Sequence, residues 1–559
     1  MRAKPEACLE RVLASQAFRV LADESMENGL NKKAAAFFEE ASSLMETLVE
    51  EEHRLPRPSR FLAELRAGLA KCEMRRGDFE VASAHAERAL AEHSACGEAF
   101  LVRGQCRRER GDNQGALSDL VNAFVFQGSA SNAAGDGGEA QAIEEVSRES
   151  CRMRAGEEFS IRAAPKALPA DWVVRSFLAS YNTDGLYAEH DNFLRLQAED
   201  PAAVAEEEEG QASTTEFWQG IGLLREGNYA ESIAKFSSSC SHSRDSEAAA
   251  LPGVTAEASG GGNKASGRIR SLALEYYGSF LYLMGDMDAA LEHLRCASEV
   301  DATNAKSWVK KGSVLNDLGR REEASQRLKA TTIEPAFECF DAAAAIAPQD
   351  SDLFLHRGQG HLLANDFRKA TTDLQTSVEL CPTMPISRAA WGVALFKLAT
   401  VDELPSPSSL SKCVQVLEDA RERFPESSEV LFFFAEVLVS MGDFTKGLEF
   451  LKEAASLDPE CPIPYVNAAR AYLGMNDTKT ARRRVHLERA SELDSTYPGT
   501  CLDLGQLLMQ EGSPAEALSM YARGVEKARF PSELHDAMAS LDVAKAHLAA
   551  QRLLRRGAA

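Results

Sequence analysis

Cysteine and histidine are the residues of this 559-residue chain that could hold a metal ion or attack a substrate. The twelve cysteines lie between Cys8 and Cys501, and none forms a Cys-x-x-Cys pair, so the zinc pattern and the redox pattern are both missing. The eleven histidines form no His-Glu-x-x-His motif. We therefore expect reduced cysteines in small core positions of a cytosolic protein, with no metal site and no cofactor.

Three other places in the sequence contain residues that could bind a ligand or do chemistry. Gly260–Lys264 (GGGNK) lacks the spacing of a phosphate-binding loop and follows no strand, which indicates a flexible linker. His356 stands beside Arg357 in a predicted helix, and we expect a structural role. The basic helix Ala481–Ala490 is either a solvated face or a contact for an acidic partner. No nucleophile, base and acid can be grouped by spacing, so the sequence predicts a protein that is not an enzyme.

Composition indicates a helical protein. The chain is 44% hydrophobic but only 7% aromatic, and its formal net charge is −23. Such a chain will not bind nucleic acid or an anionic membrane through bulk charge. It contains no run of eighteen apolar residues, and its first twenty residues carry too many charges to span a bilayer.

Small residues recur at fixed intervals between the large apolar ones. The stretches Asp352–Pro382 and Phe424–Glu460 each predict a helix, a short turn near Asn365 or Gly442, a second helix and a proline. This is the pattern of the tetratricopeptide repeat, about 34 residues in two antiparallel helices that we call helix A and helix B. The small residues allow the two helices to approach closely, and the proline ends helix B.

Counting along the chain supports this period. Gly278 and Gly312 are 34 residues apart, as are Gly358 and Gly392. These four glycines fall at position 8 of their repeats. Small residues also fall at position 20 (Ala290, Ala324, Ala370, Gly447) and position 27 (Ala297, Ala343, Ala420, Ala454), and prolines at position 32 (Pro348, Pro382, Pro425, Pro459).

Three insertions interrupt the repeats. Ser325–Ala336 is expected to restart helix B of its repeat, Thr400–Ser411 is a Pro/Ser-rich turn, and Ser243–Ser266 is a loop. We predict an all-α superhelix of about eleven repeats in two arrays. Three repeats fill an N-terminal array over residues 1–127, a linker with helical and acidic segments covers 128–212, and eight repeats fill a C-terminal array over 213–559.

Four stretches resemble the family of seventy-kilodalton receptors of the mitochondrial outer-membrane translocase. Lys166–Tyr181 (KALPADWVVRSFLASY) is similar to the segment that follows the third repeat in that family, and His356–Gln359 (HRGQ) stands in helix A of a middle repeat, as in the family. Arg423–Leu438 (RFPESSEVLFFFAEVL) and the tail Tyr521–Ala546 also resemble it. The resemblance covers most of residues 15–550.

The resemblance implies a scaffold at the cytoplasmic face of the mitochondrial outer membrane that receives preproteins and meets other translocase subunits. Members of the family are anchored by an N-terminal transmembrane helix, which this sequence does not show before its first repeat. Either the start of the gene model is truncated or the protein is soluble. The alternative function is a soluble tetratricopeptide co-chaperone or a scaffold subunit of another multiprotein complex.

The first three repeats of that family grip the acidic tails of cytosolic heat-shock chaperones through charge-assisted hydrogen bonds. Registering the repeats on Ala34, Ala82 and Ala116 places Arg19, Asp23, Gly68, Glu98 and Val102 at the gripping positions. Only Arg19 fits, since Asp23 and Glu98 would repel a carboxylate. A register shifted by one brings in Arg103 and no other donor. We expect this clamp to be degenerate.

The C-terminal array is predicted to bind cargo along its concave face. Position 9 of helix A faces the groove, and two phenylalanines near the middle add apolar surface. The polar and apolar residues together suit an amphipathic helix with a basic side. The predicted groove residues are Ser279, Ser313, Gln359, Val393, Phe396, Phe432, Glu436, Arg470 and Gln506.

Overall fold

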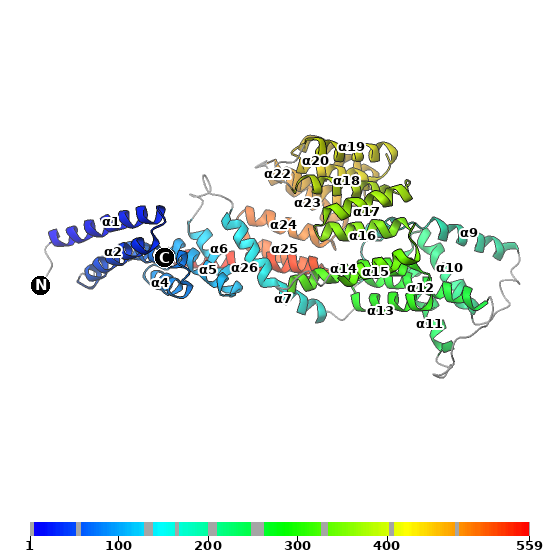
Figure 1. The fold of residues 1–559 in the computed structure, drawn as a ribbon, viewed down its shortest axis with the longest axis horizontal. Coiled ribbons are helices and arrows are strands. Elements are labelled where there is room, and N and C mark those ends of the chain that lie inside the picture. The colour runs from blue at the N-terminus through cyan, green and yellow to red at the C-terminus, as the bar shows by residue number, and fades with distance from the viewer. Residues whose placement is uncertain are drawn as a thin grey trace. The chain divides into compact units, whose positions relative to one another are not determined.

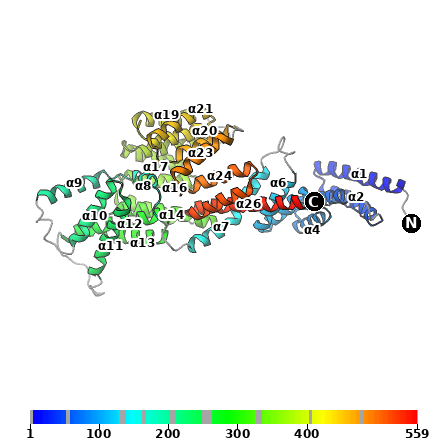
Figure 2. The same ribbon diagram turned by 180° about the vertical axis from the view of Figure 1, so that it is seen from behind.

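A computed structural model describes most of the chain as helices (Figure 1). It describes residues 5–51, 58–127, 138–161, 167–199, 210–247, 262–325, 334–401, 407–475 and 480–557. Within these ranges the chain forms twenty-six α-helices and no strand, which confirms the predicted all-α fold. Figure 2 shows the same helices from behind.

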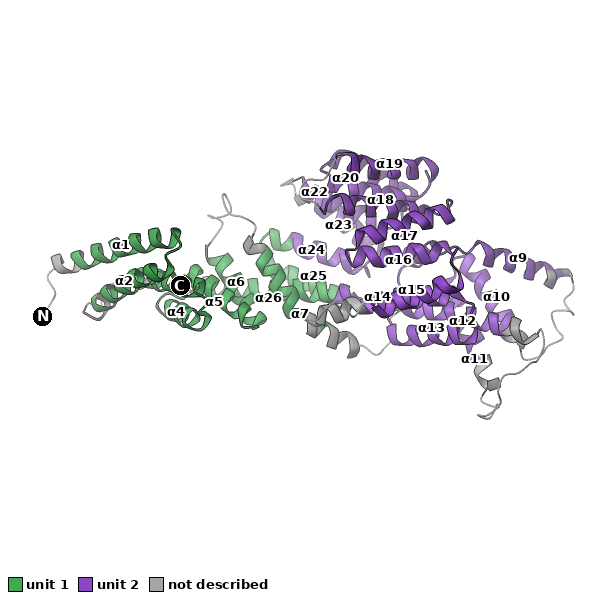
Figure 3. Cartoon of the chain, in the orientation of Figure 1, with its two compact units in different colours: residues 1–155, 508–525, 535–559 green, residues 156–507, 526–534 purple. Residues whose placement is uncertain are grey.

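The chain divides into two compact units (Figure 3). Unit 1 consists of residues 1–155, 508–525 and 535–559, and unit 2 consists of residues 156–507 and 526–534. In unit 1 the three predicted repeats are the pairs α1 and α2, α3 and α4, and α5 and α6, each packed together. Their bounds are Pro5–Glu27, Asn31–Glu51, Pro58–Arg75, Phe79–Glu92, Gly97–Glu109 and Asn113–Gln127.

Unit 2 begins with two helices of the predicted linker and continues with repeats. α8 (Asp171–Ala179) and α9 (Asp184–Glu199) come first. Seven packed A and B pairs follow: α10 (Gly210–Arg225) and α11 (Tyr229–Glu247), α12 (Gly262–Leu283) and α13 (Met287–Val300), α14 (Ala305–Ser325) and α15 (Glu334–Ile346), α16 (Ser351–Leu363) and α17 (Phe367–Leu380), α18 (Pro385–Ala399) and α19 (Pro407–Arg423), α20 (Ser428–Ser440) and α21 (Phe444–Leu457), and α22 (Ile463–Gly474) and α23 (Thr480–Leu493). α24 (Pro498–Gln510) and α25 (Pro514–Lys527) come next along the chain.

The position-8 glycines allow helix A to meet a large side chain of its own helix B. A Cβ atom placed on Gly358 would lie 2.7 Å from Leu374, and one on Gly278 would lie 3.2 Å from Leu294. In both repeats the glycine of helix A and the leucine of helix B are 16 residues apart in the sequence. Gly392 meets Leu417 in the same way, at 2.5 Å. A larger residue at these positions would push the two helices apart.

The turns between α16 and α17 and between α20 and α21 use one residue in the left-handed conformation followed by an aspartate. Gly442 has φ +87°, and Asn365 takes the equivalent place with φ +58°. The next residue, Asp443 or Asp366, accepts a hydrogen bond from the backbone N–H three residues later. This is an N-cap that satisfies one free amide of helix B. The turns predicted near Asn365 and Gly442 are thus confirmed.

The insertion Ser325–Ala336 changes its repeat as expected, with one difference. Helix A of this repeat, α14, runs on through Gly319 to Ser325, so Ala324 is not on helix B. Helix B restarts at Glu334, where fully buried Ala336 takes the place predicted for Ala324. Residues 326–333 lie outside the described part.

The other two insertions are more helical than predicted. The first residues of the predicted loop Ser243–Ser266 belong to α11, which ends at Glu247. Its last residues belong to α12, which begins at Gly262. Part of the GGGNK stretch therefore begins a helix. The last residues of the predicted turn Thr400–Ser411 lie in α19, which begins at Pro407. Residues 248–261 and 402–406 lie outside the described ranges.

Beyond its three helix pairs, unit 1 includes two helices that come from distant parts of the chain. α7 (Gly138–Ile161) and α26 (Pro531–Gly557) both contribute to the apolar cluster around α6. The Ser147 hydroxyl donates to the Ala539 carbonyl at 2.6 Å, and the ring of His547 lies 6.1 Å from that of Phe124. The last helix of the chain therefore completes the N-terminal array.

Candidate functional site

A segment of the predicted linker lies against the helices of unit 2 that should form its groove. It comprises residues 167–182, includes α8, and is called the inner segment below (Figure 2). Val174 is fully buried and belongs to the same apolar cluster as Phe217 of α10 and Tyr276 of α12. Tyr181 packs with Val309 of α14. The inner segment is therefore part of the core of unit 2.

The end of the inner segment is held by its backbone. The Asn182 N–H lies 3.0 and 2.9 Å from the two carboxylate oxygens of Asp352, which is fully buried. Lys306 donates to the Asn182 carbonyl and pairs with Asp352 at 3.1 Å. His356 Nε2 lies 3.2 Å from the Ser180 carbonyl oxygen. A carbonyl can only accept, so His356 carries its proton on Nε2.

The Tyr181 ring contacts the side chains of His356 and Lys310. It stacks on the His356 ring with centroids 4.3 Å apart, and Lys310 Nζ stands 4.7 Å from its centroid. Lys310 is buried and pairs with buried Glu275 at 2.8 Å. Burial lowers the pKa of His356 to about 4, although the charge of Asp352 opposes the change. The ring is neutral at pH 7 and suited to a buried stack.

The start of the inner segment is held by the repeats that come later in the chain. Trp172 Nε1 donates to Asp494 at 2.9 Å, and its ring meets Tyr497 edge to face at 5.7 Å. Arg175 pairs with Asp458 and Glu460, at 3.1 Å each. These contacts lie in the turns before α22 and α24. The inner segment thus joins early and late repeats of unit 2.

These holding residues were missed by reasoning from the sequence, apart from His356, for which a structural role was expected. Lys306 and Asp352 stand at position 2 of their repeats, and Lys310 and His356 at position 6, on the N-terminal half of the concave face. Charged residues at positions that the repeat pattern assigns to the groove were a usable signal, because a buried charge needs a partner. That part of the groove is occupied by the chain itself.

Burial divides the predicted groove residues. Ser279 is buried, and its hydroxyl donates to Glu275 of its own helix at 2.7 Å. Ser313 is half-buried and donates to Val309 at 3.2 Å. Gln359 is also half-buried. The hydroxyl groups of Ser279 and Ser313 thus donate to backbone carbonyls of their own helices, and these two serines expose little surface to a bound partner.

The later groove residues form an apolar part and a charged part. The structure brings Val393, Phe396 and Phe432 into one cluster, in which Phe396 is buried and the other two are half-buried. Glu436 and Gln506 are exposed. These residues come from α18, α20 and α24.

Arg470, on α22, is exposed and pairs with Asp503 of α24 at 3.0 Å. Partial desolvation by its neighbours would lower the pKa of the Arg470 guanidinium. The negative charges of Asp503 and Glu436 outweigh this effect and raise the pKa overall. The later helices therefore present accessible acidic, basic and apolar groups beside one another.

The predicted clamp positions in unit 1 are neutralised or buried. Arg19 pairs with Glu64 at 2.8 Å and approaches Asp23 at 3.8 Å. Glu98 is occupied by Lys71 at 3.2 Å. The paired bases have little positive charge left for an acidic tail.

The other two clamp positions serve packing. Val102 is buried. A Cβ atom on Gly68 would lie 2.6 Å from the Phe38 ring, so the glycine permits close packing of α2 and α3.

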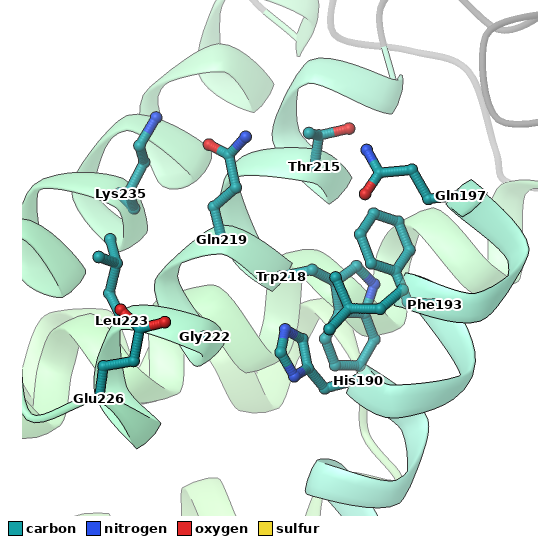
Figure 4. Close-up of a pocket in the computed structure, with 11 residues that line it drawn as sticks. His190, Phe193, Gln197, Thr215, Trp218, Gln219, Gly222, Leu223, Glu226 and Lys235 are labelled. Carbon is teal, nitrogen blue, oxygen red and sulfur yellow. The ribbon is translucent and has the colours of Figure 1, made fainter. Parts of the chain in front are cut away.

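A separate cavity of about 350 Å³ lies between α9, α10 and α11 (Figure 4). Phe193 and Trp218 stack in it with centroids 5.8 Å apart, and His190 lies 6.0 Å from Trp218. Gln197 and Gln219 add side-chain amides to its lining. None of the predicted groove residues lines this cavity.

The described residues hold no group of three histidine, cysteine or acidic side chains placed to bind a metal ion. None of the helices they form is both long enough and apolar enough to cross a bilayer.

The comparisons with known proteins agree with the repeat pattern. Tetratricopeptide-repeat family models match residues 68–134 and 428–461. The human mitochondrial import receptor subunit TOM70 is 22% identical over 386 residues, which are 68% of this chain and 56% of the relative. The Saccharomyces cerevisiae TOM70 is 24% identical over 49% of this chain and 42% of its own length. The chain thus spans about half the length of the curated relatives it matches.

The crystal structure of yeast Tom70 superposes with a TM-score of 0.52 at 18% identity, covering 96% of both chains. At this identity the likeness concerns the fold. Together with the spacing of glycines, turns and caps, it identifies the chain as a tetratricopeptide-repeat protein that resembles the mitochondrial import receptor subunit TOM70.

Proposed function

We propose that this chain is a non-enzymatic receptor that recognises mitochondrial preproteins at the cytoplasmic face of the outer membrane and passes them to translocase subunits. Arrays of tetratricopeptide repeats bind polypeptides along their concave faces. The names of the relatives, mitochondrial import receptor subunits, support the import role. In this proposal residues 1–127 and 213–559 form the two arrays, and 128–212 link them.

One observation carries the binding role. Unit 2 already holds a helical segment of its own chain, through Asp352 and Lys306 on its backbone and through Tyr181 on His356. The helices that follow offer the same kinds of groups, acidic, basic and apolar, at Glu436, Arg470 and the Val393–Phe432 cluster. A second helix with a basic and an apolar side would satisfy Glu436 and the Val393–Phe432 cluster.

A binding measurement tests this site. Phe432→Ala combined with Glu436→Lys should weaken binding of a basic amphipathic presequence-like peptide at least tenfold, about 1.4 kcal/mol. Glu453→Lys, an exposed charge reversal on α21, is the matched control and should leave the affinity unchanged. The double variant must keep its circular dichroism spectrum. Unchanged affinity in the folded double variant would place the site elsewhere.

Cell fractionation tests the location. The tagged chain should sediment with mitochondria and remain accessible to added protease, because the proposed receptor faces the cytosol. Recovery in the soluble fraction would favour a co-chaperone or a scaffold subunit of another complex.

A further inference from the structure

One edge of unit 2 carries a row of exposed apolar side chains. Leu363 ends α16, Val401 follows α18, Met441 follows α20, and Leu473 and Met475 flank the last residue of α22. Their exposed fractions are between 38 and 61%. Each lies within two residues of the C-terminal end of an A helix. We call these five residues the turn-edge row.

The row has a regular spacing. α16 packs on α18, α18 on α20 and α20 on α22, and successive A helices of such an array run in the same direction. Packed helix axes lie about 8–10 Å apart. Four helix ends therefore span roughly 24–30 Å, which is the length of a helix of about 20 residues. Seven residues advance a helix by about 10.5 Å, close to the step from one A helix to the next.

Cations border this row, and three of them lie at places that helices disfavour. Arg368 and Lys369 lie in the first turn of α17, and Lys446 lies in the first turn of α21. Positive charge at a helix N-terminus opposes the helix dipole. Arg368, Lys369 and Lys397 are exposed. Asp366 holds Lys369 at 2.9 Å, and Glu418 lies 3.5 Å from Lys446, so Arg368 and Lys397 contribute most of the uncompensated charge.

We propose that the turn-edge row binds a partner helix with an apolar residue at every seventh position and acidic residues beside them. The seven-residue spacing places one apolar side chain on each helix end, and the acidic flanks meet Arg368 and Lys397. This partner has the opposite charge to the preprotein helix proposed for the groove. The two surfaces lie on different parts of the A helices and are tested independently.

Fluorescence anisotropy with the full chain tests the proposal. The probe is a labelled 24-residue helical peptide with four leucines spaced seven residues apart and a glutamate on both sides of each leucine. Met441→Asp with Leu473→Asp should weaken its binding at least tenfold, and Lys397→Glu should weaken it several-fold. Both changes fall on exposed side chains, so the repeats should stay folded.

The control is Leu457→Asp, which places an aspartate at a leucine that is as exposed as Met441 and Leu473. Leu457 ends α21, a B helix, and so lies at the opposite edge of the array. It should leave the affinity unchanged, as should the groove change Phe432→Ala with Glu436→Lys. The proposal is overturned by the absence of binding, by equal binding of a peptide with leucine at every fifth position, or by an equal loss in Leu457→Asp. A loss in the groove variant alone would assign the peptide to the groove instead.

Discussion

Tyr181 and His356 stack with their ring centroids 4.3 Å apart, and this contact joins the inner segment to a residue of helix A that lies 175 residues later in the chain. The same histidine donates to the Ser180 carbonyl, so one side chain holds both the ring and the backbone of the segment. The contact makes the inner segment part of the folded array.

Removing this ring should destabilise unit 2. Tyr181→Ala leaves a cavity between His356 and Lys310, and truncation of a buried large aromatic side chain costs about 3–5 kcal/mol. Differential scanning calorimetry should show a fall of several degrees in the melting temperature of unit 2. Tyr181→Phe is the matched control, because it keeps the stack, and its effect should be much smaller. Equal melting of the alanine variant and the unmodified chain would show that the inner segment is not part of the core.

The neutral state of His356 predicts that stability falls in acid. Burial lowers its pKa from 6.5 to about 4, so the unfolded chain binds the proton first as the pH falls. The contribution is complete above pH 6.5 and is lost progressively toward pH 4. At pH 5 the loss from this residue is about 2 kcal/mol.

His356→Gln tests this pH dependence, because glutamine can still donate to Ser180 and does not titrate. The difference in free energy of unfolding of unit 2 between pH 7 and pH 5 should be smaller in the variant. Other groups titrate in both proteins, so the comparison isolates the histidine. The same pH dependence in both proteins would contradict a buried, neutral His356.

The N-terminal array should bind acidic chaperone tails weakly. Its one fitting donor, Arg19, is paired with Glu64, and four of the five expected donors are missing. Each charge-assisted hydrogen bond is worth about 1.5–3 kcal/mol, so we expect a dissociation constant above roughly 100 µM in calorimetry. Low-micromolar binding that Arg19→Ala abolishes would show that a different register is used.

Deleting Ser325–Ala336 should leave the melting temperature of unit 2 unchanged or raise it. The deletion joins Ala324 to Phe337, so Ala324 takes the buried place of Ala336 beside Gly312. Gly319 then falls at the turn position, where a left-handed residue is needed and glycine adopts that conformation without strain. A fall of several degrees would show that the deleted segment packs on the array.

The sequence predicted those parts of the fold that repeat locally. Glycine at position 8, the left-handed turn at Gly442 and the aspartate after it act within about 34 residues, and their spacing is visible in the chain. The position of the inner segment was not predictable in this way. Its partners, such as Asp352 and Asp494, lie 170 and 322 residues away, and no local period records such pairs.

The candidate site was likewise predictable only in part from the sequence. The repeat register predicted a groove row, and the structure gathers Val393, Phe396 and Phe432 in it, while its role in binding stays a prediction. The register could not show that Ser279 and Ser313 are used within their own helices. It also could not show that Arg19 and Lys71 are paired, because those partners lie on neighbouring helices.

The last helix of the chain has a consequence for biosynthesis. From His535 onward α26 packs beside α6 and α7 in unit 1, and this part leaves the ribosome after every residue of unit 2. Domains usually fold in order as they are synthesised, from the N-terminus onward. Here the apolar layer around Ile143 and Val146 stays uncovered until α26 has been made. Unit 1 therefore closes only after unit 2 has been synthesised, although its first helices precede unit 2 in the chain.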